Sequence, residues 1–342
     1  MKQSNGEVEI NGVNQYSDAP HEVNVDTVLR PNAWDQYIGQ QKTKDNLRVI
    51  IDATKTRNES MDHVLFCGPA GLGKTTLAYL AAKELGAQIK TTSGPALSKA
   101  GDIAAILTNL EQGDILFIDE IHRINRLIEE VLYPAMESRK LHIMVGKGAS
   151  ARSLSIDLPA FSLIGATTRE NLLSAPLRTR FGAIFRLNFY EVDDIKKIIL
   201  RSANILTIPI DEKAISILSR ASRATPRIAN RLLKRARDFA QVTGDGVINE
   251  SIAQKTLDLL DIDEKGLEPQ DRKLLEVIIK KFRGGPVGLG TLAAALNEER
   301  GVIEEIYEPY LMISGFIQRT PGGRIALEPA YEHLEYIEKK NK

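Results

Sequence analysis

Between about residue 61 and residue 190, short apolar runs alternate with amphipathic segments. Continuous apolar runs of this length favour buried strands, and apolar positions three or four apart favour helices. We expect strands at 63–67, 115–119, 161–168 and 183–189, and helices at 74–86 and 126–138. Near-continuous apolar strands separated by helices are typical of a parallel sheet covered on both faces. The pattern therefore predicts an α/β domain.

The pattern changes after Tyr190, where helical spacing replaces the strand signal at 193–206, 211–222 and 226–240. A charged, turn-rich break follows at 261–271. Beyond it lie helical stretches at 289–299 and 302–315, and then two short strands around Pro321-Gly322-Gly323. Helix, helix and hairpin in this order predict a winged helix-turn-helix. We divide the chain into a loose polar tail (1–24), the α/β domain (25–190), a small helical domain (191–263) and the winged-helix domain (264–342).

Composition narrows the class of protein without identifying its chemistry. Hydrophobic residues make up 43% of the chain and charged residues 26%, as in soluble globular proteins. Lys and Arg number 45, as do Asp and Glu, so a net charge of zero gives no indication of nucleic acid. The apolar runs are too short for a membrane span, and the tail lacks the apolar core of a signal peptide. The single cysteine, Cys67, suits the reducing cytoplasm, and we interpret it as a core residue rather than a catalytic thiol.

The stretch "GPAGLGKTT" fits the phosphate-binding pattern G-x-x-x-x-G-K-[ST], between an expected strand and an expected helix. Glycines let backbone N–H groups surround phosphate oxygens, and the N-terminus of the helix adds its positive dipole. Lys74 would contact the β- and γ-phosphates, and the Thr75 hydroxyl would ligate Mg²⁺. We therefore expect ATP with Mg²⁺, bound by Gly71, Leu72, Gly73, Lys74, Thr75 and Thr76. A glycine-rich turn without a ligand is the alternative that this context disfavours.

A second motif, "ILFIDEIHR", ends an apolar strand in Asp119 and Glu120, at the edge of the sheet where α/β proteins bind ligands. Asp119 would hold Mg²⁺, and Glu120 would orient and polarise the attacking water. Taken alone, such a pair is usually a solvated strand end, but its spacing from the first motif favours catalysis. His122 and Arg123 are interpreted only as residues at a helix start.

Longer blocks carry a resemblance to a known family over about residues 25–335. They include "GPAGLGKTTLA", "LFIDEIHR", "EEVLYPAME", "SIDLPAFSLIGATTR", "PLRTRFG", "TPRIANRLLKRARDFA" and "FRGGPVGLGTLAAAL". The chain resembles the AAA+ ATPases and, more narrowly, the RuvB family of Holliday-junction branch-migration motors. The departures are Ala70, where a second proline is expected, and Ala224, where glycine is expected. Neither removes a phosphate-contacting group, although both bear on loop rigidity and lid movement.

The resemblance implies further roles around the nucleotide. Thr167 would be the polar sensor of the γ-phosphate, and Arg227 the lid arginine that reports nucleotide state. The remaining nucleotide contacts would be Leu29, Arg30, Tyr37 and Ile38, which line an adenine pocket, and Tyr190, at the boundary with the lid.

Residues 174–190 contain Arg178, Arg180 and Arg186 but no acid. By resemblance, Arg180 is the finger that reaches the γ-phosphate of a neighbouring subunit, and this phosphate is the expected anionic partner of the segment. Alternately directed side chains cannot both reach one phosphate, so Arg178 is interpreted as structural or interfacial. A surface ion pair is the alternative role for Arg180.

The resemblance also implies partners. Residues 141–158 would form a hairpin that docks on RuvA, with an exposed meander as the alternative. Arg319 and Arg324, which flank the Pro-Gly-Gly turn, and Arg300, expected at the end of the first helix of the pair, would contact double-stranded DNA. Residues 267–342 contain 11 Lys or Arg against 12 Asp or Glu, so the pattern itself leaves a protein-docking role open. The family further implies a homo-hexamer and a RuvC-type resolvase in a larger complex.

Together with these motifs, the resemblance implies an ATP-driven motor that moves duplex DNA in recombination, DNA repair and the SOS response. A nucleotide switch that barely hydrolyses ATP and a clamp-loader-like subunit are the alternatives. Glu120 and Arg180 favour hydrolysis, while the winged helix and the hairpin disfavour the clamp loader.

Overall fold

The computed structural model describes residues 25–145 and 152–340. The chain separates into two compact units, residues 1–30 and 31–342. In the first unit, helix α1 (Val25–Val28) precedes Leu29, which is buried, and Arg30, which is exposed. The expected tail (1–24) and the tip of the expected hairpin (146–148) lie outside the described residues. The four-part division of the chain stays a prediction.

The second unit begins with a five-stranded parallel sheet in the order β2-β3-β6-β1-β7. The strands are β1 (Val64–Cys67), β2 (Ile89–Ser93), β3 (Ile115–Asp119), β6 (Ser162–Thr167) and β7 (Ala183–Arg186). Four of them confirm the expected strands to within three residues at each end. The apolar pattern did not indicate β2, because this partly exposed edge strand has the mixed sequence IKTTS.

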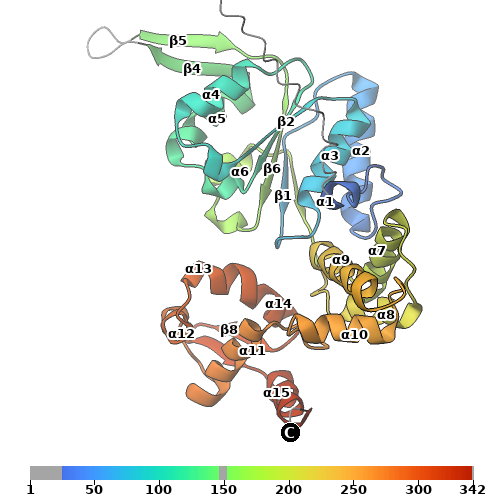
Figure 1. Cartoon of the computed structure of the whole chain (residues 1–342). Coiled ribbons are helices and arrows are strands. Elements are labelled where there is room, and N and C mark those ends of the chain that lie inside the picture. Colours follow the sequence, from blue (N-terminus) through green and yellow to red (C-terminus); the bar gives the residue numbers. More distant parts are fainter. Residues whose placement is uncertain (1–24, 146–151, 341–342) are drawn as a thin grey trace, which may run out of the picture. The chain divides into compact units, whose positions relative to one another are not determined.

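Helices cover both faces of this sheet (Figure 1). Along β1, Val64 and Phe66 join one core cluster, whereas Leu65 and Cys67 join the other, as the alternation of a strand requires. Helices α2 (Gln41–Arg57) and α3 (Lys74–Leu85) pack on the first face. The second face is covered by α4 (Ala100–Thr108), α5 (Arg126–Ser138) and α6 (Ala175–Thr179). The α/β class and both expected helices are confirmed.

The carboxyl ends of three central strands meet at one edge of the sheet. Strand β6 lies between β1 and β3, so Thr167 is flanked by the loop after Cys67 and by Asp119. Short 3-10 turns lie beyond β2, β3 and β6, namely η1 (Gly94–Ala96), η2 (Ile121–Arg123) and η4 (Glu170–Leu172). This edge gathers the residues that the two motifs predicted.

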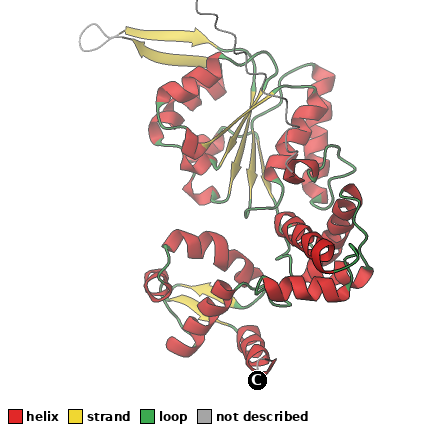
Figure 2. Cartoon of the chain, in the orientation of Figure 1, coloured by secondary structure: helices red, strands yellow, loops and turns green. Residues whose placement is uncertain are grey.

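Strands β4 (Lys140–Val145) and β5 (Arg152–Asp157) form an antiparallel hairpin, which confirms a hairpin rather than a meander (Figure 2). The pairs Leu141–Ile156 and Ile143–Leu154 share one face. Leu141 is buried, but Leu154 is 50% exposed. The hairpin therefore carries an apolar face that its own domain covers only in part.

The lid consists of α7 (Val192–Ile205), α8 (Glu212–Arg220), α9 (Pro226–Thr243) and α10 (Glu250–Leu259). Buried residues of these helices continue the core of the first sheet face through Tyr190. The expected helical segments are confirmed. Within the described residues, we find no helix with the length and apolarity needed to span a membrane.

The C-terminal module, called the head below, is a winged helix with its own core. Its elements are α11 (Pro269–Glu276), the π-helical η5 (Val277–Lys281), α12 (Leu289–Leu296), α13 (Arg300–Val302), the π-helical η6 (Ile303–Tyr307), α14 (Glu308–Ile313), β8 (Ile317–Thr320), β9 (Gly323–Ala326) and α15 (Glu328–Lys340). The expected position of Arg300 was wrong. Helix α12 ends at Leu296 because Asn297 adopts a left-handed conformation with φ of 56°, and Arg300 begins the next helix.

Candidate functional site

The loop after β1 has the backbone that the phosphate motif predicted. Gly68, Gly71 and Gly73 have φ values of 141°, 82° and 98°, in the region that favours glycine. A Cβ on Gly68 would lie 2.7 Å from the carbonyl oxygen of Leu187, so this position has no space for a side chain. Helix α3 begins at Lys74, and its free N–H groups face the loop. This is a backbone cradle suited to phosphate oxygens.

Lys74 is 6% exposed, and its Nζ donates to the carbonyl oxygens of Gly68 and Pro69 at 2.6 and 2.9 Å. Burial lowers the pKa of Lys74, and the nearby carboxylates of Glu120 and Asp119 oppose that effect. The loop's own carbonyls thus hold the ammonium group where a phosphate would compete for it. The side chain fits the expected contact with the β- and γ-phosphates.

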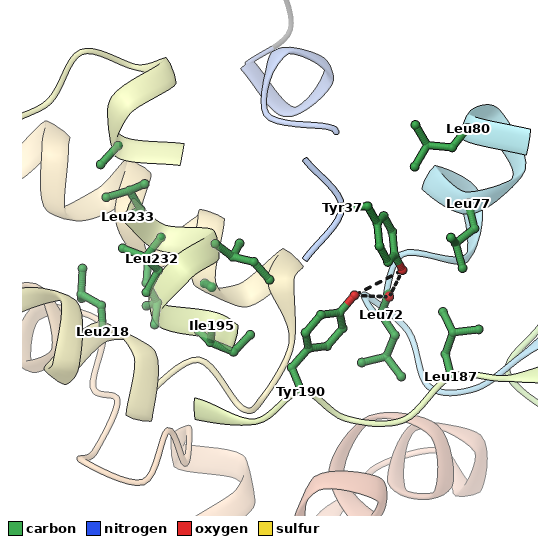
Figure 3. Close-up of a cluster of buried hydrophobic side chains, with 14 of the residues drawn as sticks. Tyr37, Leu72, Leu77, Leu80, Leu187, Tyr190, Ile195, Leu218, Leu232 and Leu233 are labelled. Carbon is green, nitrogen blue, oxygen red and sulfur yellow. Dashed lines mark hydrogen bonds between the residues drawn. The ribbon is translucent and has the colours of Figure 1, made fainter. Parts of the chain in front are cut away.

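Two tyrosines from distant parts of the chain clamp this loop (Figure 3). The hydroxyls of Tyr37 and Tyr190 lie 3.3 and 3.2 Å from the carbonyl oxygen of Leu72 and 3.2 Å from each other. Burial raises the pKa of Tyr190 to about 12 and that of Tyr37 well above 10, so both phenols stay protonated donors. A Cβ on Gly73 would lie 2.6 Å from the Tyr37 hydroxyl. Both tyrosines therefore support the phosphate loop directly.

Other expected nucleotide contacts have simpler positions. Thr75 and Thr76 lie in the first turn of α3 and are half-buried, and Ile38 is half-buried against the core. Leu29 and Arg30 belong to the first unit, and their part in an adenine pocket stays a prediction.

The acidic pair lies where β3 ends. The Glu120 N–H donates to Oδ1 of Asp119 at 2.9 Å. Glu120 itself has a left-handed backbone, with φ of 48°, which turns its side chain toward the end of β6. Gly94, in η1, was not identified from the sequence, although a Cβ there would lie 2.3 Å from the carbonyl oxygen of Glu120. This close approach is the physical reason for glycine in "TTSGPAL".

Thr167, which ends β6, and Thr168, which follows it, face different partners. The hydroxyl of Thr168 donates to Oε2 of Glu120 at 3.1 Å. Thr167, the expected sensor, is fully buried, accepts from the N–H of Arg169 at 3.0 Å and lies 3.0 Å from Nδ1 of His122. The same Nδ1 lies 3.2 Å from Oε2 of Glu120, and burial lowers the pKa of His122. Thr168 and the contact of His122 with Thr167 and Glu120 were not identified from the sequence. The only sequence signals for these two residues are the strings "GATT", which ends at Thr168, and "DEIH", which ends at His122.

Arg227 lies in the first turn of α9, close to the phosphate loop. A Cβ on Gly71 would lie 3.0 Å from Cβ of Arg227. The N–H of Tyr190 donates to the carbonyl oxygen of Ala224 at 3.0 Å, three residues before this arginine. The first turn of the lid helix is thus in contact with the loop that would hold the phosphates.

Two arginines of residues 174–190, Arg180 and Arg186, have acidic partners elsewhere in the chain, unlike the expectation from the segment alone. Arg180 contacts Oε1 of Glu137 at 2.8 Å, donates to the carbonyl oxygen of Pro176 at 2.6 Å, and lies over the ring of Tyr133 at 4.5 Å. Arg186 pairs with Glu170 through two hydrogen bonds, of 2.9 and 2.6 Å. The acids come from α5 and η4, which a local sequence window does not include.

The residues present fit a magnesium–nucleotide complex. The glycine cradle is closed to side chains, Lys74 is directed at its own loop, and Asp119 lies at the adjacent strand end with Thr75 on α3. Among the described residues, no group of three or more His, Cys, Asp or Glu side chains could hold a metal by itself. A cation held by one carboxylate and one hydroxyl completes its shell with phosphate oxygens and water, as Mg²⁺ prefers.

The expected DNA-contacting arginines differ in their surroundings. Arg319 and Arg324 face each other across β8 and β9, and both pair with Glu308, which is fully buried. The Arg324 side chain is 13% exposed and that of Arg319 is 45% exposed. Arg300 is exposed and lies against Gly290. Arg300 and Arg319 are thus accessible to a phosphate, whereas Arg324 holds the wing together.

Comparison with protein families matches the chain in three consecutive stretches. They are the P-loop domain of the Holliday junction DNA helicase RuvB over residues 29–187, the RuvB AAA lid domain over 190–263 and the RuvB C-terminal winged helix domain over 264–335.

Solved structures show the same likeness. The chain is similar to the Thermotoga maritima RuvB Holliday junction branch migration motor, with a TM-score of 0.83 and 50% identity over 90% of this chain and 98% of that one. Two point mutants of Thermotoga maritima RuvB match with TM-scores of 0.83 and 0.84 at the same identity and coverage. Because P-loop domain, lid and winged helix all match in this order, the chain belongs to the RuvB family.

Proposed function

We propose that this protein is an ATP-driven motor that moves duplex DNA and drives branch migration of Holliday junctions together with RuvA. The observation that carries the proposal is the meeting of the phosphate cradle, Lys74 and the Glu120–Thr168 pair at one edge of the sheet. That arrangement can bind a triphosphate and orient water, the two requirements of phosphoryl transfer to water.

Each residue has a role in this proposal. Backbone N–H groups of the loop and Lys74 hold the phosphates, while Thr75 and Asp119 hold Mg²⁺, which neutralises charge on the phosphate oxygens. Glu120 accepts a proton from the attacking water. Because Thr168 rather than Thr167 bonds Glu120, we assign the sensing of the γ-phosphate to Thr168. Thr167 and His122 support the strand end behind it.

Assembly and partners complete the proposal. Arg180 leaves Glu137 to reach the γ-phosphate of the next subunit in a hexameric ring, and Arg227 reports nucleotide state to the lid. The partly uncovered hairpin face around Leu154 docks on RuvA, and a RuvC-type resolvase joins the larger complex in the cytoplasm. Arg300 and Arg319 contact the DNA backbone without reading bases.

The test is migration of a four-way DNA junction with RuvA, ATP and Mg²⁺. We expect branch migration and DNA-stimulated ATP turnover from the native chain. Glu120→Gln should bind ATP within about twofold of the native affinity but lose turnover by at least about 100-fold, because only the water-orienting carboxylate is removed. Junctions that stay in place despite ATP turnover would refute the proposed motor function. ATP binding without turnover by the native chain would support a nucleotide switch.

A further inference from the structure

The segment Arg223–Arg227, which joins α8 to α9, touches the nucleotide loop. Its Ala224 carbonyl accepts from the N–H of Tyr190, the residue whose hydroxyl clamps Leu72. A Cβ on Gly71 would lie 3.0 Å from Cβ of Arg227 and 3.7 Å from Cβ of Thr225. A rearrangement of the phosphate loop therefore acts on this segment without any intermediate element.

Arg223, at the start of the same segment, reaches into the head. Its guanidinium donates to both carboxylate oxygens of Asp271 in α11, at 2.8 and 3.3 Å, and to the carbonyl oxygen of Ile306 at 3.2 Å. It also lies over the ring of Tyr310, 4.9 Å from the ring centre. Arg223 is 6% exposed and Asp271 is 0% exposed, so this is a buried ion pair between lid and head. These contacts fix the arginine in direction as well as in distance.

This arrangement is costly, which argues against an incidental contact. Burial of both charges carries a desolvation penalty that good geometry only offsets. Arg223 also has a left-handed backbone, with φ of 53°, which is uncommon for a residue with a long side chain. Asp271 has a second task, since its carboxylate accepts the N–H of Glu268 and caps α11. Removal of Arg223 would thus loosen the point where the head begins.

The other contacts at this junction do not involve the segment that touches the nucleotide loop. Arg272 pairs with Asp261 at 2.6 Å, and Nε2 of His333 lies 2.9 Å from Oδ2 of Asp263, but both acids follow α10. Arg231 on α9 pairs with Glu268 at 2.6 Å, but their side chains are 51% and 39% exposed, and such pairs contribute little. Gly266 allows close backbone packing, because a Cβ there would lie 2.6 Å from the carbonyl oxygen of Ala221. The Arg231–Glu268 pair joins the same two domains as Arg223–Asp271 and serves as the matched control.

We propose that Arg223 is a positioning residue that fixes the head to the lid, so that nucleotide-dependent movement of residues 224–227 is passed to the DNA-contacting head. The transfer of nucleotide-dependent movement to the head rests on the proposed motor function. The fixed lid–head geometry itself can be tested without that function.

The first experiment measures the lid–head distance in the full-length protein, with spin labels at Lys255→Cys and Gln318→Cys, both exposed positions. The native Cys67 is buried. We expect one narrow distance distribution with ADP, a distribution about twice as broad in Arg223→Met, and no broadening in Arg231→Met. An unchanged width in Arg223→Met would refute the proposal whether or not the chain is a motor.

The second experiment counts junction steps per ATP hydrolysed, a ratio that a loss of folded protein does not change. Arg223→Met should keep its DNA-independent ATP turnover within about twofold while migration per ATP falls about tenfold. Arg223→Lys keeps the charge but not the planar guanidinium, so its migration per ATP should lie between that of the native chain and that of Arg223→Met. Arg231→Met should match the native ratio. A native ratio in Arg223→Met overturns the proposal. Absence of migration by the native chain would instead count against the motor function.

Arg223→Met leaves Asp271 without its partner, and that variant can fail to fold. The double variant Arg223→Met/Asp271→Leu replaces the whole pair with apolar groups, a change that proteins often tolerate. A folded double variant that loses coupling supports the proposal, and one that keeps native migration per ATP overturns it.

Discussion

At the residue scale, the adjacent Thr167 and Thr168 separate a structural contact from a proposed catalytic one. Thr168 donates to Glu120, whereas the buried hydroxyl of Thr167 sits between His122 and a backbone N–H. The string "GATT" cannot distinguish them, because which hydroxyl meets Glu120 depends on how β6 lies beside β3.

Substitution of each threonine by valine should separate these roles. We expect Thr168→Val to reduce ATP turnover by about 10- to 100-fold at nearly unchanged stability, because the bond to Glu120 is lost. Thr167→Val should lower the free energy of unfolding by about 1–2 kcal/mol, since buried polar neighbours lose a partner. Turnover assays and denaturant unfolding measure the two effects. The reverse pattern would return the sensor role to Thr167.

His63 predicts how stability depends on pH. Its Nδ1 accepts from the N–H of Leu163 at 2.8 Å, its Nε2 lies 3.2 Å from the carbonyl oxygen of Met136, and burial lowers its pKa. Below about pH 6.5 the unfolded chain takes up a proton that the native state resists. The free energy of unfolding therefore decreases as the pH is lowered, by at most about 1.4 kcal/mol per pH unit. The loss ends once the pH passes below the native pKa.

Denaturant unfolding between pH 7.5 and pH 5.5 checks this sign. His63→Gln, which cannot titrate, should show a shallower decline than the native chain. His122, whose pKa burial also lowers, is present in both proteins and does not affect the comparison. Equal slopes would show that His63 does not contribute.

At the scale of elements, the hairpin β4–β5 has the expected strand pairing, and its proposed partner is RuvA. Leu154 is half exposed on the face that it shares with Ile143, while Ser155 is exposed on the other face. A single exposed apolar side chain is ordinary, but Leu154 continues the partly covered apolar face of the hairpin, which is the basis of the proposed docking surface.

Leu154→Asp should therefore weaken stimulation by RuvA at least about tenfold, because a charge replaces an apolar contact. ATP turnover without RuvA should stay native, since the hairpin lies outside the phosphate site. Titration of RuvA in the turnover assay measures the effect, with Ser155→Asp as the control that keeps native stimulation. Equal losses in both variants would indicate a general charge effect instead.

Elements with a strong local pattern were predictable. Helix α5 follows its expected bounds, and β3 does too, because one continuous apolar run or one amphipathic stripe defines each. Strand β2 was missed because an edge strand is only partly covered and needs no apolar run. Arg300 was placed in the wrong helix because the end of α12 depends on the backbone of Asn297.

At the scale of the whole molecule, the proposed role of Arg180 is to link one subunit to the next. Within the subunit its guanidinium contacts Glu137 and Tyr133, and its side chain is 19% exposed. An arginine supplied in trans contributes about 10³–10⁵ in rate, far more than an exposed ion pair contributes to stability. The finger role therefore predicts a much larger effect on turnover than on folding.

Mixing experiments test that role. Arg180→Ala subunits should bind ATP normally but fail to activate native neighbours, so turnover of mixed rings falls more steeply than the native fraction. Glu137→Gln, which removes only the partner within the subunit, should keep turnover within about threefold. Full turnover by isolated native monomers, or equal losses in both variants, would exclude an in-trans finger.

The fold class, the domain order and the phosphate and acidic motifs were readable from the sequence alone, because strand, loop and helix follow one another within a few residues there. Which side chains meet across the chain became known only from the folded arrangement. Tyr37 and Tyr190 are 153 residues apart, and Arg223 and Asp271 are 48 residues apart, yet each pair is in contact. Such contacts depend on how domains pack, and local propensity carries no record of that packing.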